Sequence, residues 1–192
     1  MSHTAELIAV GTELLLGNIA NTDAQMLSQG LSQLGINVYY HTVVGDNPQR
    51  VRQAVDIARG RADILITTGG LGPTCDDLTK VAVAQAFGKE LVYHEPSAQR
   101  IRERFAQRGT PVTENNFQQA MVPEGCTVLD NDWGTAPGVA FQPGGTHAPM
   151  LPGPPRARAM ILRHRALPSP RPPADGRHPP PPLTTLPPRA PA

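Results

Sequence analysis

The sequence predicts an α/β protein whose mostly parallel sheet is covered by helices on both faces. In the first 95 residues, short apolar runs alternate with amphipathic segments of helical spacing. Such alternation is typical of strand–helix units, whose crossovers cover both sides of a parallel sheet. Two of the apolar runs end in glycine-rich turns, and ligands of such sheets bind at the carboxyl ends of the strands. A length of 192 residues favours one domain, with at most an appendage.

Three apolar runs are predicted to be the first buried strands. Leu7–Val10 is compact and apolar, and Ile64–Ile66 has the same character. Val38–Val44 is rich in β-branched and aromatic residues, which favour strands. Three amphipathic segments are predicted to be helices. Each begins at a capping residue or proline and ends at a glycine: Asn21 to Gly35, Pro48 to Gly60, and Asp76 to Gly88.

The second half of the chain is less regular. Pro96 to Gly109 predicts a basic helix, Asn115 to Ala120 another short helical segment, and short strands follow from residue 122 onward. Residues 168–192 hold eleven prolines in 25 positions, a composition that cannot form a helix or a sheet ladder. We therefore expect a folded domain over residues 1–160 and a disordered, Arg/Pro-rich tail over residues 161–192.

Composition excludes several classes of protein. Residues 1–155 hold ten Lys and Arg against fifteen Asp and Glu, and an acidic body is a poor match for a nucleic-acid backbone. Cys75 and Cys126 have no metal-ligand or redox spacing, so free thiols in a reducing cytosol are expected. The start of the chain lacks the features of a signal peptide, and no apolar stretch approaches the roughly 20 residues that span a bilayer. The expectation is a cytoplasmic protein without membrane partners.

The strongest functional signal is the run from Thr67 to Thr79, in which a strand leads through Gly69, Gly70 and Gly72 into a helix. Glycines let the backbone bend with positive φ and let a ligand lie against main-chain N–H groups. Together with the positive end of the next helix, these groups form an anion site, to which the Thr74 hydroxyl can add a hydrogen bond. The run therefore predicts a phosphate-binding loop.

Asp76 and Asp77 follow this loop and allow two interpretations. The first is simple helix capping, which we expect of one of the two, because Asp is common at helix starts. A second carboxylate beside a phosphate would instead repel the ligand unless a divalent cation lay between them. Mg²⁺ is typically held by one or two carboxylates together with substrate phosphates. A metal-assisted phosphate reaction is therefore one of the two expectations.

Four weaker candidates lie at the same predicted edge or near it. Gly11-Thr12-Glu13 could face the ligand or form an ordinary turn, and Asp46 could serve the site or cap the helix after it. The segment from Asn131 to Gly138 contains Trp133, which could stack on a base or simply pack. Gly153, between prolines, could present N–H groups or form a turn that binds nothing.

Several of these motifs together resemble a known family. The chain carries Gly11–Gly17 with Asn21-Thr22, Thr42–Asp46, the run from Thr67 to Thr79, Gly134–Gly138 and Leu151–Arg156. In this order they are similar to the N-terminal domain of the competence/damage-inducible CinA proteins, over about residues 4–160. The resemblance implies a MoaB/MogA-like molybdopterin-binding fold, a three-layer α/β/α sandwich.

The resemblance also implies functions for individual residues. Asp77 and Asp46 match aspartates regarded as functional in the pterin-binding relatives, so they are the expected catalytic residues and metal ligands. Gly69, Gly70, Gly72 and Thr74 match the loop that holds the phosphate or pterin of the ligand. Gly11-Thr12-Glu13 and Gly153 complete the expected binding set. The deamidase domain of longer CinA proteins is not expected in this chain.

Three functions follow as alternatives. The first is a hydrolase that uses Mg²⁺ or Co²⁺ to cleave the pyrophosphate of ADP-ribose, the activity associated with CinA-type domains. The second is a pterin-binding or adenylyl-transferring domain, which would use much the same loop. The third is a non-catalytic nucleotide-binding protein. In each, the expected partner is a phosphorylated small molecule, and we expect a homo-oligomer.

Overall fold

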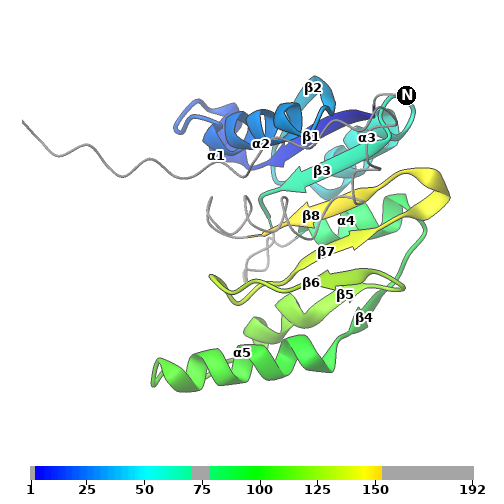
Figure 1. Cartoon of the computed structure of the whole chain (residues 1–192). Coiled ribbons are helices and arrows are strands. Elements are labelled where there is room, and N and C mark those ends of the chain that lie inside the picture. Colours follow the sequence, from blue (N-terminus) through cyan, green and yellow to red (C-terminus); the bar gives the residue numbers. More distant parts are fainter. Residues whose placement is uncertain (1–2, 71–77, 153–192) are drawn as a thin grey trace, which may run out of the picture.

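The computed structural model describes residues 3–70 and 78–152 and contains a six-stranded sheet of order β2-β1-β3-β8-β7-β6. Figure 1 shows these strands descending from β2 at the top to β6. The strands of this sheet are β1 (Thr4–Val10), β2 (Asn37–Val44), β3 (Ile64–Thr68), β6 (Thr127–Leu129), β7 (Gly138–Phe141) and β8 (Ala148–Leu151). The predicted α/β class with a mostly parallel sheet is confirmed.

The sheet is parallel in its larger part and antiparallel at one end. β1 pairs in parallel with both β2 and β3, and β3 pairs in parallel with β8. β7 pairs antiparallel with β8, and β6 antiparallel with β7. Only six residues separate β7 from β8, which is too short for a crossover and long enough for a hairpin.

Successive residues of the central strands alternate between the two faces of the sheet. Leu7 and Ile66 pack on the face covered by α2 (Thr22–Gln33). Ile8 and Leu65 pack on the opposite face, which is covered by α3 (Pro48–Arg59) and α4 (Leu78–Ala86). The helices therefore flank the sheet on both sides, as predicted.

The helix boundaries follow from local chemistry. The side chains of Asn21 and Asn47 cap α2 and α3 by accepting hydrogen bonds from backbone N–H groups three residues on. His94 does the same for α5 (Glu95–Gln107), so this helix begins one residue earlier than predicted. The short helical segment predicted from Asn115 to Ala120 is the 3₁₀ helix η1 (Glu114–Ala120).

A small second unit lies beyond β6, where α5 occupies the bottom of the molecule in Figure 1. It consists of α5, η1 and a two-stranded antiparallel sheet of β4 (Leu91–Tyr93) and β5 (Met121–Pro123), with its own apolar cluster around Ala98 and Ile101. The buried Lys80 of α4 ties this unit to the main sheet, because its Nζ donates to the carbonyl oxygens of Gln118 and Met121 at 3.1 and 2.7 Å.

Some expectations concern residues that the structure does not describe. The tail predicted over residues 161–192 is among them, as are Asp76 and Asp77. Within residues 3–70 and 78–152, no helix has the length and apolarity needed to cross a bilayer.

Candidate functional site

The turns singled out in the sequence meet at one edge of the sheet. The parallel strands β1, β2, β3 and β8 all end there, at Val10, Val44, Thr68 and Leu151. Because β7 runs antiparallel to β8, its first residue, Gly138, lies at this edge too, and so does the end of β6. We call this edge the rim. Connections that are far apart in sequence therefore come together on it.

The glycine loop begins with two residues that only glycine accommodates. Gly69 has φ +88°, and a Cβ on it would stand 2.1 Å from the carbonyl oxygen of Val10. Gly70 has φ +61°, and a Cβ on it would stand 2.1 Å from the hydroxyl oxygen of Thr79. Both approaches are far inside van der Waals contact. The turn after β3 is thus folded tightly onto the end of β1 and the start of α4.

Other predicted members of the binding set lie outside the described residues. These are Gly72, Thr74, Asp77 and Gly153. The roles of these four residues therefore remain predictions from the sequence.

Thr79 is a residue that the sequence interpretation left without a role. Its side chain is fully buried, and its hydroxyl has no hydrogen-bond partner among the described residues. The hydroxyl of Thr67, one residue before the end of β3, is in the same state. Buried hydroxyls are usually paired, so these two mark a polar spot next to the glycine turn that no described residue satisfies. The close approach of Gly70 to the Thr79 hydroxyl could not be inferred from sequence spacing alone.

Asp46 and Thr12 are brought together by β2 and β1. One carboxylate oxygen of Asp46, Oδ2, accepts from the backbone N–H of Thr12 at 2.9 Å and from its hydroxyl at 2.8 Å. In return the backbone N–H of Asp46 donates to the Thr12 hydroxyl at 3.2 Å. The second carboxylate oxygen, Oδ1, has no partner within the described ranges. Asp46 is exposed, so Oδ1 can meet solvent or a ligand.

The helix-cap interpretation of Asp46 is wrong, because the cap of α3 is the side chain of Asn47. The interpretation of residues 11–13 as part of a turn is only partly correct. Thr12 begins the one-turn helix α1 (Thr12–Leu15), and the Glu13 carboxylate folds back to within 2.5 Å of where a Cβ on Gly11 would stand. Gly11 is therefore required for this position of Glu13.

Of the two predicted cation ligands, Asp46 belongs to the described residues and Asp77 does not. Among residues 3–70 and 78–152, no three His, Cys, Asp or Glu side chains are grouped as metal ligands. Asp46 contributes one available carboxylate oxygen. Hard oxygen atoms of this kind are the ligands that Mg²⁺ prefers. A two-carboxylate site would need Asp77 as its other member.

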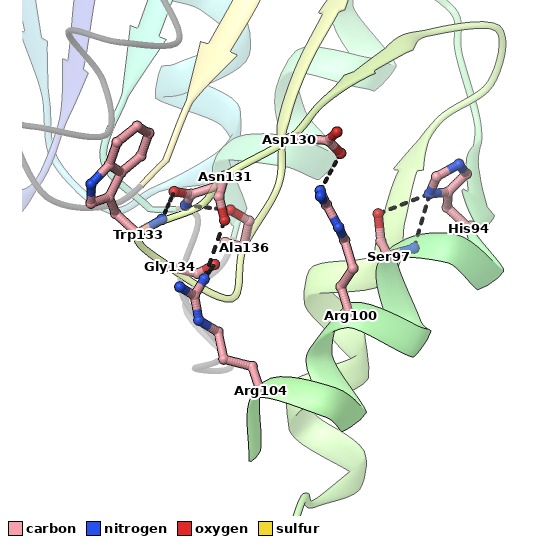
Figure 2. Close-up of polar contacts among 9 residues, drawn as sticks. All are labelled: His94, Ser97, Arg100, Arg104, Asp130, Asn131, Trp133, Gly134 and Ala136. Carbon is pink, nitrogen blue, oxygen red and sulfur yellow. Dashed lines mark hydrogen bonds and ion pairs between the residues drawn. The ribbon is translucent and has the colours of Figure 1, made fainter. Parts of the chain in front are cut away.

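The segment 130–137, which we call the rim loop, joins β6 to β7 on the same edge. Figure 2 shows how it is held. Asn131 is buried, and its side chain accepts from the N–H of Trp133 at 3.1 Å and donates to the carbonyl oxygen of Ala136 at 2.8 Å. From α5, the guanidinium of Arg104 donates to the carbonyl oxygens of Asn131, Asp132 and Gly134. Arg100 pairs with Asp130 nearby.

A pocket of about 200 Å³ lies between the rim loop and α5. Its lining includes Arg100, Glu103, Arg104 and Asp132. Charges of both signs line this pocket, and both arginines are already engaged with the loop. The pocket therefore lies beside the contacts by which α5 holds the rim loop. We do not assign the phosphate site to it.

Comparison with known proteins gives consistent results. The family model described as "Probable molybdopterin binding domain" matches residues 6–170. A CinA-like protein of Dictyoglomus turgidum is 56% identical over 163 residues, which are 85% of this chain and 40% of that protein. A relative in Bacillus thuringiensis, named for competence-damage induction, is 57% identical over 79% of this chain and 37% of its own. The chain thus spans about two fifths of the length of these curated relatives.

Solved structures show the same relationship. The structure of CinA from Thermoplasma acidophilum, described as of unknown function, matches with a TM-score of 0.78 and 31% identity over 84% of this chain and 95% of that one. MoaB from Thermus thermophilus shares the fold, with a TM-score of 0.55, 21% identity and coverage of 83% and 87%. The chain therefore belongs to the family of probable molybdopterin binding domains and is a CinA-like member of it.

Proposed function

We propose that this domain is a metal-dependent hydrolase of a nucleoside-diphosphate compound of the ADP-ribose type. The observation that carries the proposal is the glycine turn at the rim. Gly69 and Gly70 are half-buried and carry no side chain, so a ligand at this turn would meet main-chain atoms. Main-chain N–H groups at such a turn suit phosphate oxygens.

Asp46 supports the hydrolytic part of the proposal. Thr12 fixes the orientation of its carboxylate, and Oδ1 is left as an oxygen ligand at the same rim. With Asp77, the other expected ligand, it would hold a divalent cation. A bound cation would supply charge neutralisation at the bridging phosphates and a more acidic water. The residues of the chain would orient the two phosphates, while N–H groups of the glycine loop stabilise negative charge that develops on phosphorus-bound oxygen.

The direct test is incubation of the purified protein with ADP-ribose and Mg²⁺ or Co²⁺, followed by detection of AMP. The proposal expects AMP formation that requires the cation and is abolished by Asp77→Asn. Asp56→Asn is the matched control, because Asp56 is a half-exposed carboxylate on α3 whose ion pairs among the described residues are with Arg52 and Arg59. Unchanged hydrolysis by the Asp77→Asn variant would remove Asp77 as the metal ligand.

A pterin-binding function is the second candidate, because the matching family model is named for molybdopterin binding. A pterin-binding domain would use the same glycine loop as the hydrolase. Only the identity of the bound ligand can therefore distinguish these two functions. Thermal stabilisation by a pterin phosphate, with no AMP formed from ADP-ribose, would favour this candidate. Stabilisation by a nucleotide with no turnover would instead indicate the non-catalytic nucleotide-binding alternative.

A further inference from the structure

Trp133 is the only tryptophan of the chain and lies on the rim loop with 43% of its surface exposed. Within the described part of the molecule, no aromatic ring or cation stacks on its indole. Tryptophan has a large apolar surface, and leaving it in water gives up the stabilisation that burial provides. An exposed tryptophan is therefore informative when the segment that carries it is rigid.

The rim loop is held in place from one side. Arg104 donates to three of its carbonyl oxygens, and the buried Asn131 bridges the N–H of Trp133 and the carbonyl oxygen of Ala136. Gly134 fits closely as well, because a Cβ there would stand 2.7 Å from Nδ2 of Asn131. Figure 2 shows the indole on the side of the loop away from Arg104 and α5. The backbone beneath Trp133 is thus fixed before any partner arrives.

The rim loop also lies at a suitable distance from the glycine turn. The strand that follows it, β7, is two strands from β3 in the sheet, with β8 between them. Neighbouring strands are about 4.8 Å apart, so the two connections are separated by about 10 Å along the rim. A ligand whose phosphates lie on the glycine turn can therefore extend a ring towards Trp133.

We propose that Trp133 is a stacking platform for the planar heteroaromatic ring of the ligand, a nucleobase or a pterin, whose phosphate end lies on the glycine turn. This inference rests on one part of the proposed function, the binding of a phosphorylated ligand at the rim. It does not require that the ligand is hydrolysed. Stacking on an aromatic side chain contributes about 1–3 kcal/mol per base and tolerates different rings. Trp133 is in this sense a specificity residue for ligands that carry a ring.

The test compares ligands with and without a ring, none of which the proposed hydrolase activity can consume. AMP and ribose 5-phosphate differ by the adenine base, and their affinities are measured by calorimetry for the wild type, Trp133→Ala and Trp133→Phe. We expect Trp133→Ala to weaken AMP binding about 5- to 150-fold and to leave ribose 5-phosphate within about twofold. Trp133→Phe should keep most of the AMP affinity. AMP, but not ribose 5-phosphate, should change the emission of the wild-type tryptophan.

Tyr39→Ala is the matched control, because Tyr39 is an aromatic residue on β2 that is 65% exposed. It should leave both affinities unchanged. Equal losses for AMP and ribose 5-phosphate in Trp133→Ala, or an unchanged AMP affinity, would overturn the inference. Binding of neither AMP nor neopterin phosphate by the wild type would overturn it too. Binding of neopterin phosphate that depends on Trp133, without any AMP binding, would uphold the platform and favour the pterin-binding candidate over the ADP-ribose hydrolase.

Discussion

Thr12 holds the carboxylate of Asp46 through two hydrogen bonds to a single oxygen atom, Oδ2. The two residues lie just beyond the ends of the adjacent parallel strands β1 and β2, and their contacts fix the second oxygen, Oδ1, in a defined place on the rim. Oδ2 of Asp46 thus has a structural role, and Oδ1 is available as a metal ligand. Substitutions can separate these two properties.

Asp46→Asn tests whether the charge of Asp46 matters. An asparagine side chain can still accept hydrogen bonds from Thr12, so we expect the melting temperature to change little. If Asp46 holds a cation, hydrolysis of ADP-ribose should fall by at least the roughly 10- to 100-fold typical of lost metal-supporting groups, with a higher Mg²⁺ requirement. The measurement is initial rate against Mg²⁺ concentration. A variant with wild-type rates at every Mg²⁺ concentration would exclude Asp46 as a ligand.

Gly69→Ala should destabilise the fold more than Gly88→Ala. Both glycines have positive φ, +88° and +63°, so each alanine carries a backbone penalty of about 1–2 kcal/mol. Only at Gly69 does the new Cβ meet backbone, at 2.1 Å from Val10, whereas nothing lies within 4 Å of a Cβ on Gly88. The clash should add about 1–3 kcal/mol, measured by urea unfolding. Equal effects of the two substitutions would show that the turn relaxes freely.

Arg61→Met should destabilise the domain by leaving a buried carboxylate without its cationic partner, with only the hydrogen bond from the Thr42 hydroxyl at 2.6 Å among the contacts of the described residues. The Glu6 side chain is completely buried in β1 and accepts from Nε and Nη2 of Arg61 at 2.8 and 2.7 Å. Breaking such a pair costs about 3–5 kcal/mol, and we expect the low end because 34% of the Arg61 side chain is exposed. Glu6→Met with Arg61→Met should recover much of this loss. A double variant less stable than Arg61→Met alone would contradict the prediction.

Cys126 should react slowly with iodoacetamide at neutral pH. Burial raises the pKa of its thiol, so a smaller fraction is the reactive thiolate than in a free cysteine. The rate should continue to rise at pH values where free cysteine is already fully ionised. The measurement uses a Cys75→Ser background, in which Cys126 is the only thiol, and free cysteine as reference. A rate that levels off at the same pH as free cysteine would show an unperturbed thiol.

Much of the fold could be predicted because its signals are local. The periodicity of the apolar runs indicated the strands around Ile8 and Leu65, and glycines and capping residues indicated where the helices end. The burial of Glu6 gave no local signal, since its partner Arg61 lies 55 residues away. The small β4–β5 sheet was also missed, because three-residue strands are too short to show a period.

The candidate site could be predicted as a set of turns on one edge but not as a set of contacts. Parallel topology alone places the ends of β1, β2 and β3 together. The antiparallel direction of β7 brings the rim loop to the same edge, and the short β7–β8 connection favours this direction because six residues allow a hairpin but no crossover. The Thr12–Asp46 bonds and the Gly70–Thr79 approach depend on packing across the sheet, which no spacing rule encodes.

Arg104 has a consequence for how the protein responds to heating. It reaches from α5, whose apolar cluster is separate from those of the main sheet, to the loop that carries Trp133. Loss of the smaller cluster would remove the Arg104 bonds and loosen the loop that carries Trp133, leaving the Asn131 bonds as its support. Affinity for the ring end of a ligand would then decline at temperatures below the global melting transition, and affinity for its phosphate end would persist.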